Sequence, residues 1–475
     1  MKIYSGILMA MFFAVSFCQA QQTEGIYNKP LTEVLAKVEK KYHLKFEYNN
    51  DLVHGVNVYT SEGFTSNLES TLDNILKPLG LVYSKTSGDT YKIYEFEAAH
   101  RYTIEQGAKH LEKLLTLYSN AKEFDQRKKE LRECLIKTLG INPHLKGGPL
   151  HSIMRPKVVM NGYTVQNVAF ESMPGYYVTG SLYKPLKGKG PFPVILSPHG
   201  HFYSETNKAI SQDSGRYAPD MQTYCAGLAK MGAIVFIYDM YSWGESVLET
   251  GNHTFHYTPF AEAIQTWNSI RGLDFLLSLP GADKKRVGVT GASGGGTQAI
   301  LVSALDDRVT ADVPVVMVSS SFDGGCECES GLPIHNCGKY KTNNAEIAAL
   351  FAPRPQLIIS EDADWTRSVP GTDFPYLKKV YNFYGKEMNI ENAHLHDKHH
   401  DYGITKRVPM YTFFSKTFGL NLKAISDGNG NIDENGITIQ NNKDMHVYGE
   451  GHPLPANALR SHQEIMKAFK KFMSK

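Results

Sequence analysis

The chain has 475 residues, which is long for one domain and favours two or three. Its apolar content of 42% and charged content of 21% are ordinary for a soluble globular protein. The formal net charge of +2 gives no reason to expect nucleic acid or an acidic partner.

The N-terminus predicts a secretory signal peptide over residues 1–20. A positively charged start precedes an apolar run over residues 7–17, and the small Ala20 lies before the expected cleavage site. Cys18 offers lipidation as an alternative, but Phe17 is a poor residue before a lipidated cysteine. No later apolar run is long enough to span a bilayer. We therefore expect an exported, soluble protein in a bacterial periplasm.

Residues 27–96 predict a compact α+β unit. Apolar residues recur at helical spacing from Leu31, a strand-like segment follows at 44–48, and a second helix ends before Gly80. A Ser-Gly-Asp turn at 87–89 lies between two strand-like segments and predicts a hairpin.

Three segments of this unit resemble the short N-terminal domain of secretins and TonB-dependent receptors. They are LTEVLAKVEKKYHLKFEYNNDLVHG, NLESTLDNILKPLGLVY and DTYKIYE. In that family the domain is a periplasmic interaction module, so the resemblance implies a periplasmic protein partner for residues 27–96. The unit carries no catalytic constellation, and a small folding cap is the alternative.

Residues 100–140 predict a helical lead-in, whose second helix covers 128–139 and ends at Gly140. After residue 158 the pattern changes to strands. The segments 176–179 and 181–183 predict antiparallel strands. Short apolar runs then alternate with helical segments, which favours βαβ units and a parallel sheet covered by helices. The runs lie at 193–196, 233–238, 287–289, 313–318 and 356–359, and the helices at 223–231 and 260–279.

The stretch RVGVTGASGGGTQAIL contains G-x-S-x-G between a strand and a helix. This setting lifts the Ser293 hydroxyl clear of the backbone and predicts a nucleophile, whereas a bystander serine on a glycine-rich turn is the alternative. His199-Gly200-His201 follows the strand at 193–196. The N–H groups of His201 and Gly294 are the expected oxyanion hole.

An acid and a base follow in the order that the chemistry requires. The segment SEDADW places several carboxylates after the strand at 356–359; Asp364 is preferred because it lies farther past the strand end, and Asp362 stays open. His400 follows a further strand at 390–395 and is the expected base, with His399 and His396 as alternatives.

Residues 100–475 resemble the α/β-hydrolase superfamily, and in particular bacterial acetylxylan-esterase-like proteins. The segments that carry the resemblance are SPHGH, YDMYSWGES, GVTGASGGGTQ, GGCECE, SEDADWT, FPYLKKVY and HHDYGITKR. The family pattern places the nucleophile at Ser293, the acid at Asp364 and the base at His400. The family often has a glycine before the acid, whereas this chain has Asp362-Ala363, and this difference keeps Asp362 open.

Five cysteines remain after signal cleavage, so at least one thiol is unpaired. Cys326, Cys328 and Cys337 lie in one loop, and a disulfide from Cys337 to Cys326 or Cys328 is favoured over a zinc site in an oxidising compartment. We expect no metal and no cofactor.

The sequence therefore predicts a serine esterase. The resemblance implies acetyl or similar small acyl groups on plant polysaccharide fragments as the substrate class. Three alternatives remain. They are a glucuronoyl esterase, a peptidase of the prolyl-oligopeptidase type, and a periplasmic interaction or signalling protein with an inactive hydrolase domain.

Overall fold

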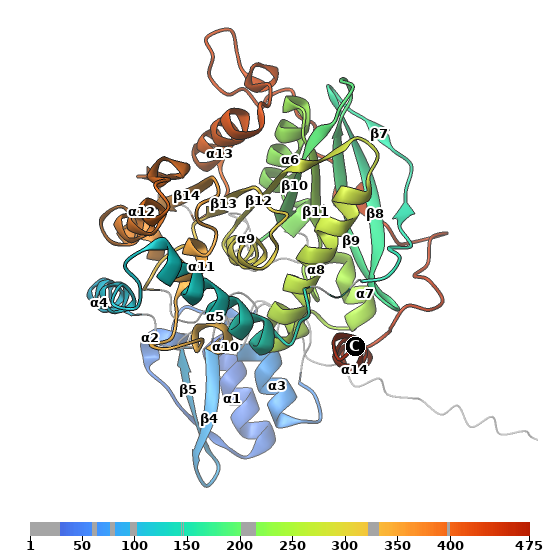
Figure 1. Cartoon of the computed structure of the whole chain (residues 1–475). Helices are drawn as coiled ribbons and strands as arrows, with labels where there is room; N and C mark the ends of the chain where they lie inside the picture. The colour runs from blue at the N-terminus through green and yellow to red at the C-terminus, as the bar shows by residue number, and fades with distance from the viewer. Residues whose placement is uncertain are drawn as a thin grey trace, which may run out of the picture. The chain divides into compact units, whose positions relative to one another are not determined.

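The computed structural model describes residues 29–58, 64–76, 81–95, 102–143, 145, 147–200, 215–321, 332–396 and 400–475 (Figure 1). The chain divides into two compact units, Met1–Glu95 and Phe96–Lys475. The expected signal peptide at 1–20 lies outside the described residues.

The N-terminal unit is built around the helices that the apolar spacing predicted. Leu31, Val34 and Val38 are fully buried on one side of the first helix and pack with Leu72 and Ile75 of the third. A three-stranded sheet of order β2-β5-β4 completes the unit, and β4 and β5 form the expected hairpin. The elements are β1 (Lys29–Pro30), α1 (Leu31–Tyr42), β2 (Lys45–Glu47), α2 (Asn50–Val53), β3 (Asn57–Val58), α3 (Leu68–Leu76), β4 (Leu81–Ser87) and β5 (Thr90–Glu95).

The helical lead-in consists of α4 (Ile104–Leu114) and α5 (Ala121–Leu139). The second helix starts seven residues earlier than the sequence predicted, because the Asn120 side chain accepts from the Glu123 N–H and caps it there. Gly140 ends the helix with φ +61°, as expected. A buried ion pair, 2.8 Å between Arg127 and Glu346, helps to fix the lead-in to the rest of the unit.

Within the described ranges, ten strands form one sheet of order β15-β14-β13-β12-β10-β11-β9-β8-β6, with β7 paired to β8. The six strands from β11 to β15 in this order are parallel, and β9 and β8 extend the sheet antiparallel. The strands are β6 (Ile153–Met154), β7 (Val158–Val159), β8 (Tyr163–Met173), β9 (Tyr176–Pro185), β10 (Phe192–Pro198), β11 (Ile234–Tyr238), β12 (Ala282–Ala292), β13 (Ala311–Val315), β14 (Gln356–Glu361) and β15 (Ile390–Leu395).

The prediction of two separate strands at 176–179 and 181–183 is wrong. Both segments belong to β9, and its antiparallel partner is β8, which the sequence reading did not identify. Gly180 does not turn the chain. It allows a close approach, since a Cβ there would lie 2.4 Å from the Ile237 carbonyl oxygen of the neighbouring strand.

Helices cover both faces of the sheet (Figure 1). Residues of α5, α8, α9, α11, α12 and α14 share one apolar core, and residues of α6 and α13 share the core on the other face. Val194 and Ile195 of β10 point to opposite cores, which explains why the parallel strands read as continuous apolar runs. The remaining helices are α6 (Pro219–Met231), α7 (Val247–Thr250), α8 (Pro259–Ser278), α9 (Gly294–Leu305), α10 (Leu332–His335), α11 (Asn344–Ala349), α12 (Phe374–Phe383), α13 (Ile404–Phe418) and α14 (His462–Met473).

The disulfide differs from the one expected. Cys337 is bonded to Cys134 of α5, with 5.6 Å between their Cα atoms, and not to Cys326 or Cys328. The partner comes from 203 residues away because packing brings α5 against α10, a contact that local spacing cannot reveal. Cys326 and Cys328 lie outside the described residues. Cys225 is a free, buried thiol.

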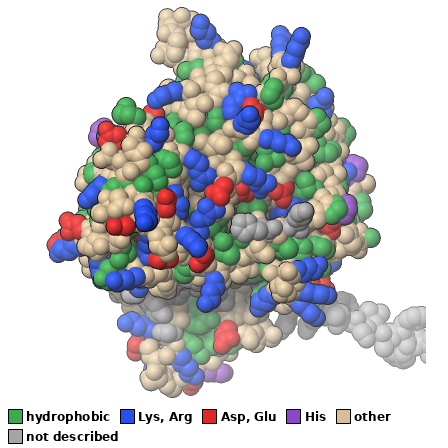
Figure 2. Space-filling model, in the orientation of Figure 1, with side chains coloured by type: hydrophobic (Ala, Val, Ile, Leu, Met, Phe, Trp, Pro, Cys, Tyr) green, Lys and Arg blue, Asp and Glu red, His purple; other side chains and the backbone are tan. Residues whose placement is uncertain are grey.

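Basic and acidic side chains are interspersed on the visible face of the C-terminal unit (Figure 2). This distribution agrees with the small net charge of the sequence. Among the helices of the described ranges, none has the length and apolarity that a membrane crossing requires.

Candidate active site

Ser293 lies between the end of β12 and the start of α9, at the carboxyl edge of the parallel strands. Its backbone has φ +56° and ψ −123°, a strained conformation for a residue with a side chain. The Ser293 N–H donates to the Val315 carbonyl at 3.0 Å, which ties the turn to β13. This sharp strand-to-helix turn is the geometry that G-x-S-x-G predicted.

Glycines around Ser293 let the loop after β10 pack directly on this turn. A Cβ at Gly295 would lie 2.2 Å from the Pro198 carbonyl oxygen. A Cβ at Gly200 would lie 2.4 Å from the Ala292 carbonyl oxygen and 2.9 Å from the Ser293 Cβ. Backbone atoms cannot yield to such contacts, so only glycine fits at these two positions.

The structure describes one of the two residues expected to form the oxyanion hole. Gly294 is the first residue of α9, where backbone N–H groups have no acceptor within the helix and the helix dipole favours negative charge. His201 lies outside the described residues. The His199 ring is buried and accepts from the Met240 N–H at 3.3 Å, a contact that holds the loop after β10 against the loop after β11.

Asp364 is buried just past β14, and each of its oxygens has a defined role. Oδ1 accepts from the backbone N–H and the hydroxyl of Thr366, both at 2.6 Å. Oδ2 lies 2.7 Å from Nδ1 of His400. Because Thr366 fixes the carboxylate, the second oxygen is held in place to orient the imidazole.

The other ring nitrogen of His400 is buried and has no hydrogen-bond partner among the described residues, so no hydrogen bond joins it to Ser293. The Trp365 ring packs against the imidazole, with 4.6 Å between centroids. With Nδ1–H donated to Asp364, Nε2 carries the free lone pair of a general base. This nitrogen is therefore free to accept a proton from a group that approaches it.

Two of the alternatives, Asp362 and His396, belong to a different cluster. Asp362 contacts His394 and His396, whereas among the described residues the carboxylate bonded to His400 is that of Asp364. His396 is exposed and belongs to that second cluster. His399 lies outside the described residues.

A buried ion pair lies behind the acid, and sequence reasoning did not find it. Lys406 Nζ is 2.8 Å from Glu361 Oε2 and 2.9 Å from Asp401 Oδ1, and the Lys406 and Glu361 side chains are fully buried. Burial, opposed by Lys406 and reinforced by the Asp364 carboxylate, raises the pKa of Glu361 to about 7. The sequence shows only a lysine near the start of α13. Such a lysine is normally exposed to solvent, so its burial could not be predicted from the sequence.

A second buried cluster fixes the loop after β11. Arg216 is fully buried, 2.8 Å from Asp239 and 2.7 Å from Glu245. Its guanidinium also donates to the Ser181 hydroxyl and to the Met445 carbonyl. These contacts join the segment after residue 215 to the loop that carries YDMYSWGES, so that motif has a structural role.

The mostly parallel sheet, the strained serine turn and the acid–histidine pair define the class of α/β-hydrolase esterases. Residues 246–333 match the family model described as acetyl xylan esterase (AXE1). The chain is also 24% identical over 305 residues to the 4-O-methyl-glucuronoyl methylesterase of Neurospora crassa, which is 55% of this chain and 68% of that protein.

The chain is also similar to the solved structure of Methylesterase BT1017. The two are 39% identical, the match covers 95% of this chain and 99% of that one, and the TM-score is 0.72. The chain belongs to the family of this methylesterase, and it is a carboxylic ester hydrolase. The predicted α/β-hydrolase fold and esterase activity are confirmed, and the alternative of a non-enzymatic interaction protein is not supported.

Proposed function

We propose that the chain is a serine esterase of carbohydrates in which Ser293 is the nucleophile, His400 the general base and Asp364 the orienting acid. One observation carries this assignment. His400 donates to a doubly anchored Asp364 through Nδ1 and keeps a buried, unpartnered Nε2 at the strand edge on which Ser293 lies. The missing bond to Ser293 is compatible with this role, because catalytic hydrogen bonds often tighten only when substrate is bound.

The reaction follows from the positions of these groups. His400 Nε2 takes the Ser293 hydroxyl proton as Oγ attacks the ester carbonyl, and the Gly294 N–H faces the oxygen that gains negative charge. The imidazolium then gives its proton to the leaving alcohol. Water, deprotonated by the same nitrogen, releases the acid from the acyl-enzyme.

We propose a methyl ester of a sugar carboxylate as the substrate class. The support is that a relative matching nearly the whole chain is named a methylesterase, and that the Neurospora crassa relative is also named a methylesterase. For this substrate the sugar acid forms the acyl-enzyme and methanol leaves. A glucuronoyl esterase is one form of this proposal.

An acetylated carbohydrate is the second candidate. It is favoured by the acetyl xylan esterase model, which matches residues 246–333 around Ser293. The two candidates differ in what leaves first, since an acetyl ester gives an acetyl-enzyme and a free sugar hydroxyl. The products therefore distinguish them.

The experiment is to incubate the purified chain with methyl-esterified uronate oligosaccharides and, separately, with acetylated xylan, and to measure methanol and acetate. Methanol release that is lost in Ser293→Ala supports the first candidate. Acetate release alone supports the second. If Ser293→Ala keeps wild-type turnover of either substrate, the catalytic assignment is wrong.

We also propose that the chain is exported to the periplasm and that residues 27–96 bind a protein there. The apolar start at residues 1–20 and the Cys134–Cys337 disulfide support export, because such bonds persist in oxidising compartments. Fractionation of cells expressing the full chain and a chain without residues 1–20 tests this. Equal recovery of both in the cytoplasmic fraction would contradict export.

A further inference from the structure

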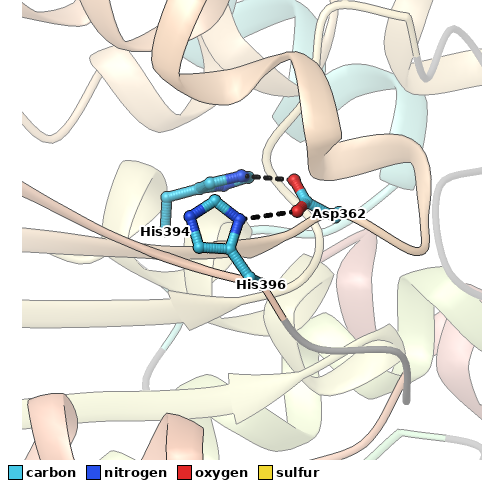
Figure 3. A group of neighbouring side chains, drawn as sticks. All are labelled: Asp362, His394 and His396. Atoms are coloured by element: carbon cyan, nitrogen blue, oxygen red, sulfur yellow. Dashed lines mark hydrogen bonds and ion pairs between the residues drawn. The ribbon is translucent and has the colours of Figure 1, made fainter.

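Three potential metal ligands meet at the edge of the sheet, beside the catalytic pair and separate from it. Asp362 Oδ1 lies 2.8 Å from His394 Nε2, and Asp362 Oδ2 lies 2.7 Å from His396 Nδ1. Figure 3 shows both imidazoles pointing at the two oxygens of the one carboxylate. One ligand atom from each residue lies within 4.8 Å of the others.

Strand pairing brings these residues together. β14 and β15 are parallel, with Ser360 opposite His394. The Asp362 N–H continues the ladder by donating to the Leu395 carbonyl at 3.2 Å. Side chains two residues apart in a strand share a face, so His394 and His396 project on the same side as Asp362. The backbone of two adjacent strands therefore fixes the cluster.

We propose that Asp362, His394 and His396 form a binding site for one divalent transition-metal ion, with Zn²⁺ as the best-fitting example. Imidazole and carboxylate ligands suit zinc, nickel, copper and iron, whereas calcium and magnesium take oxygen ligands. Within the described ranges the cluster supplies three ligands, which leaves a position for water or a substrate group.

The present geometry is close to what a bound ion requires. Zinc–ligand distances of about 2.0–2.2 Å in a tetrahedral site place neighbouring ligand atoms roughly 3.3 Å apart. Each imidazole nitrogen lies 2.7 or 2.8 Å from a different oxygen of Asp362, and one ligand atom from each residue lies within 4.8 Å of the others, so the three side chains reach one ion by local adjustment. The exposure of His396 and of Asp362 gives the ion access and lets these side chains adjust.

Support from a second layer of residues distinguishes this cluster from a chance surface contact. His394 is largely buried, and its Nδ1 lies 2.8 Å from the Ser360 hydroxyl, which accepts from the Asn392 amide at 3.0 Å. A hydroxyl can donate to Nδ1 or accept from it, so the ring can present either Nε2–H to Asp362 or a free Nε2 to an ion. Such partners orient metal-bound histidines in known sites.

An ion here joins the ends of β14 and β15, the strands that lead to Asp364 and His400. It is therefore expected to stabilise the edge of the sheet that holds the catalytic pair.

The test is binding of ZnCl₂ to the full chain, freed of metal with EDTA and then dialysed, by titration calorimetry at pH 7.5. His394→Ala, His396→Ala and Asp362→Asn are compared with His452→Ala, a control that removes an exposed histidine elsewhere. His396→Ala is the most informative variant, because its exposed side chain is not needed for folding. All titrations are repeated in Ser293→Ala, so the result does not depend on turnover or on the proposed function.

One zinc per chain, weakened at least about tenfold in each ligand variant and unchanged in His452→Ala, is the expected result. Zinc should also raise the Tm of the wild type and not that of His396→Ala. Loading with Cu²⁺ should give a nitrogen-coupled electron paramagnetic resonance spectrum that His396→Ala alters. The proposal is overturned if the wild type takes up no zinc, or if the three ligand variants bind zinc as tightly as the wild type.

Discussion

Lys406 Nζ lies 2.8 Å from Glu361 Oε2, and both side chains are fully buried next to the strand end that leads to Asp364. A pair of this kind has already lost its hydration, so each charge depends on the other. The ion pair joins α13 to β14 behind Asp364, the proposed catalytic acid.

Lys406→Met should therefore destabilise the chain by about 3–5 kcal/mol, since it leaves Glu361 buried without its partner. Adding Glu361→Gln removes the unpaired buried charge and should restore a large part of the lost stability. Thermal and urea unfolding of the two single variants and the double variant measure this coupling. Additive effects of the two substitutions would show that the pair is not energetically linked.

Asp364→Asn should lower kcat by roughly 10³–10⁴-fold with little change in KM, because the amide cannot hold the His400 tautomer. Asp362→Asn, assayed in EDTA so that metal plays no part, should show a far smaller fall in kcat. Steady-state kinetics on the preferred ester, with circular dichroism to confirm folding, make the comparison. Larger losses for Asp362→Asn would restore Asp362 as the catalytic acid.

Gly295→Ala should abolish most activity, because the new methyl group would lie 2.2 Å from the Pro198 carbonyl oxygen and push the loop after β10 from the serine turn. Gly371→Ala is the matched control, since nothing lies within 4 Å of a Cβ there. The measurements are kcat/KM and Tm for both variants. Wild-type activity in Gly295→Ala would mean that the close contact does not position the site.

Asp312 supplies a prediction for the pH dependence of stability. It is fully buried in β13, and desolvation raises the pKa of its carboxyl from 3.8 to about 7. The folded state therefore binds the proton more tightly than the unfolded state. The stability from this group is fully present below about pH 4 and is lost as the pH rises to about 7.

Asp312→Asn keeps an acceptor for Gln356, which donates to Asp312 at 2.9 Å, and removes the ionisation. The variant should gain Tm relative to the wild type as the pH rises from 4 to 7, by the equivalent of a few kcal/mol. Scanning calorimetry at half-unit pH steps measures the difference. A Tm difference that stays constant across this range would show that Asp312 does not titrate there.

Much of the fold could be predicted because its signals are local. The apolar runs gave β10, β11, β12 and β14, since strands buried on both faces must be apolar throughout. The glycine-flanked Ser293 and its place after β12 follow from the same local pattern, because only such a sequence makes the turn. β8 escaped prediction, because polar residues such as Gln166 and Asn167 interrupt its apolar pattern.

The sequence alone determined the order of chemical groups along the chain: a serine on a strained turn, then a carboxylate, then a histidine, each after a strand. Only the tertiary structure decided which members of each set meet. It paired His400 with Asp364, placed Asp362 with His394 and His396, buried Lys406 against Glu361 and bonded Cys134 to Cys337. The physical reason is that side-chain chemistry and strand propensity depend on residues close together in the sequence. Strand register, the face to which a side chain points and long-range packing depend on elements far apart in the chain.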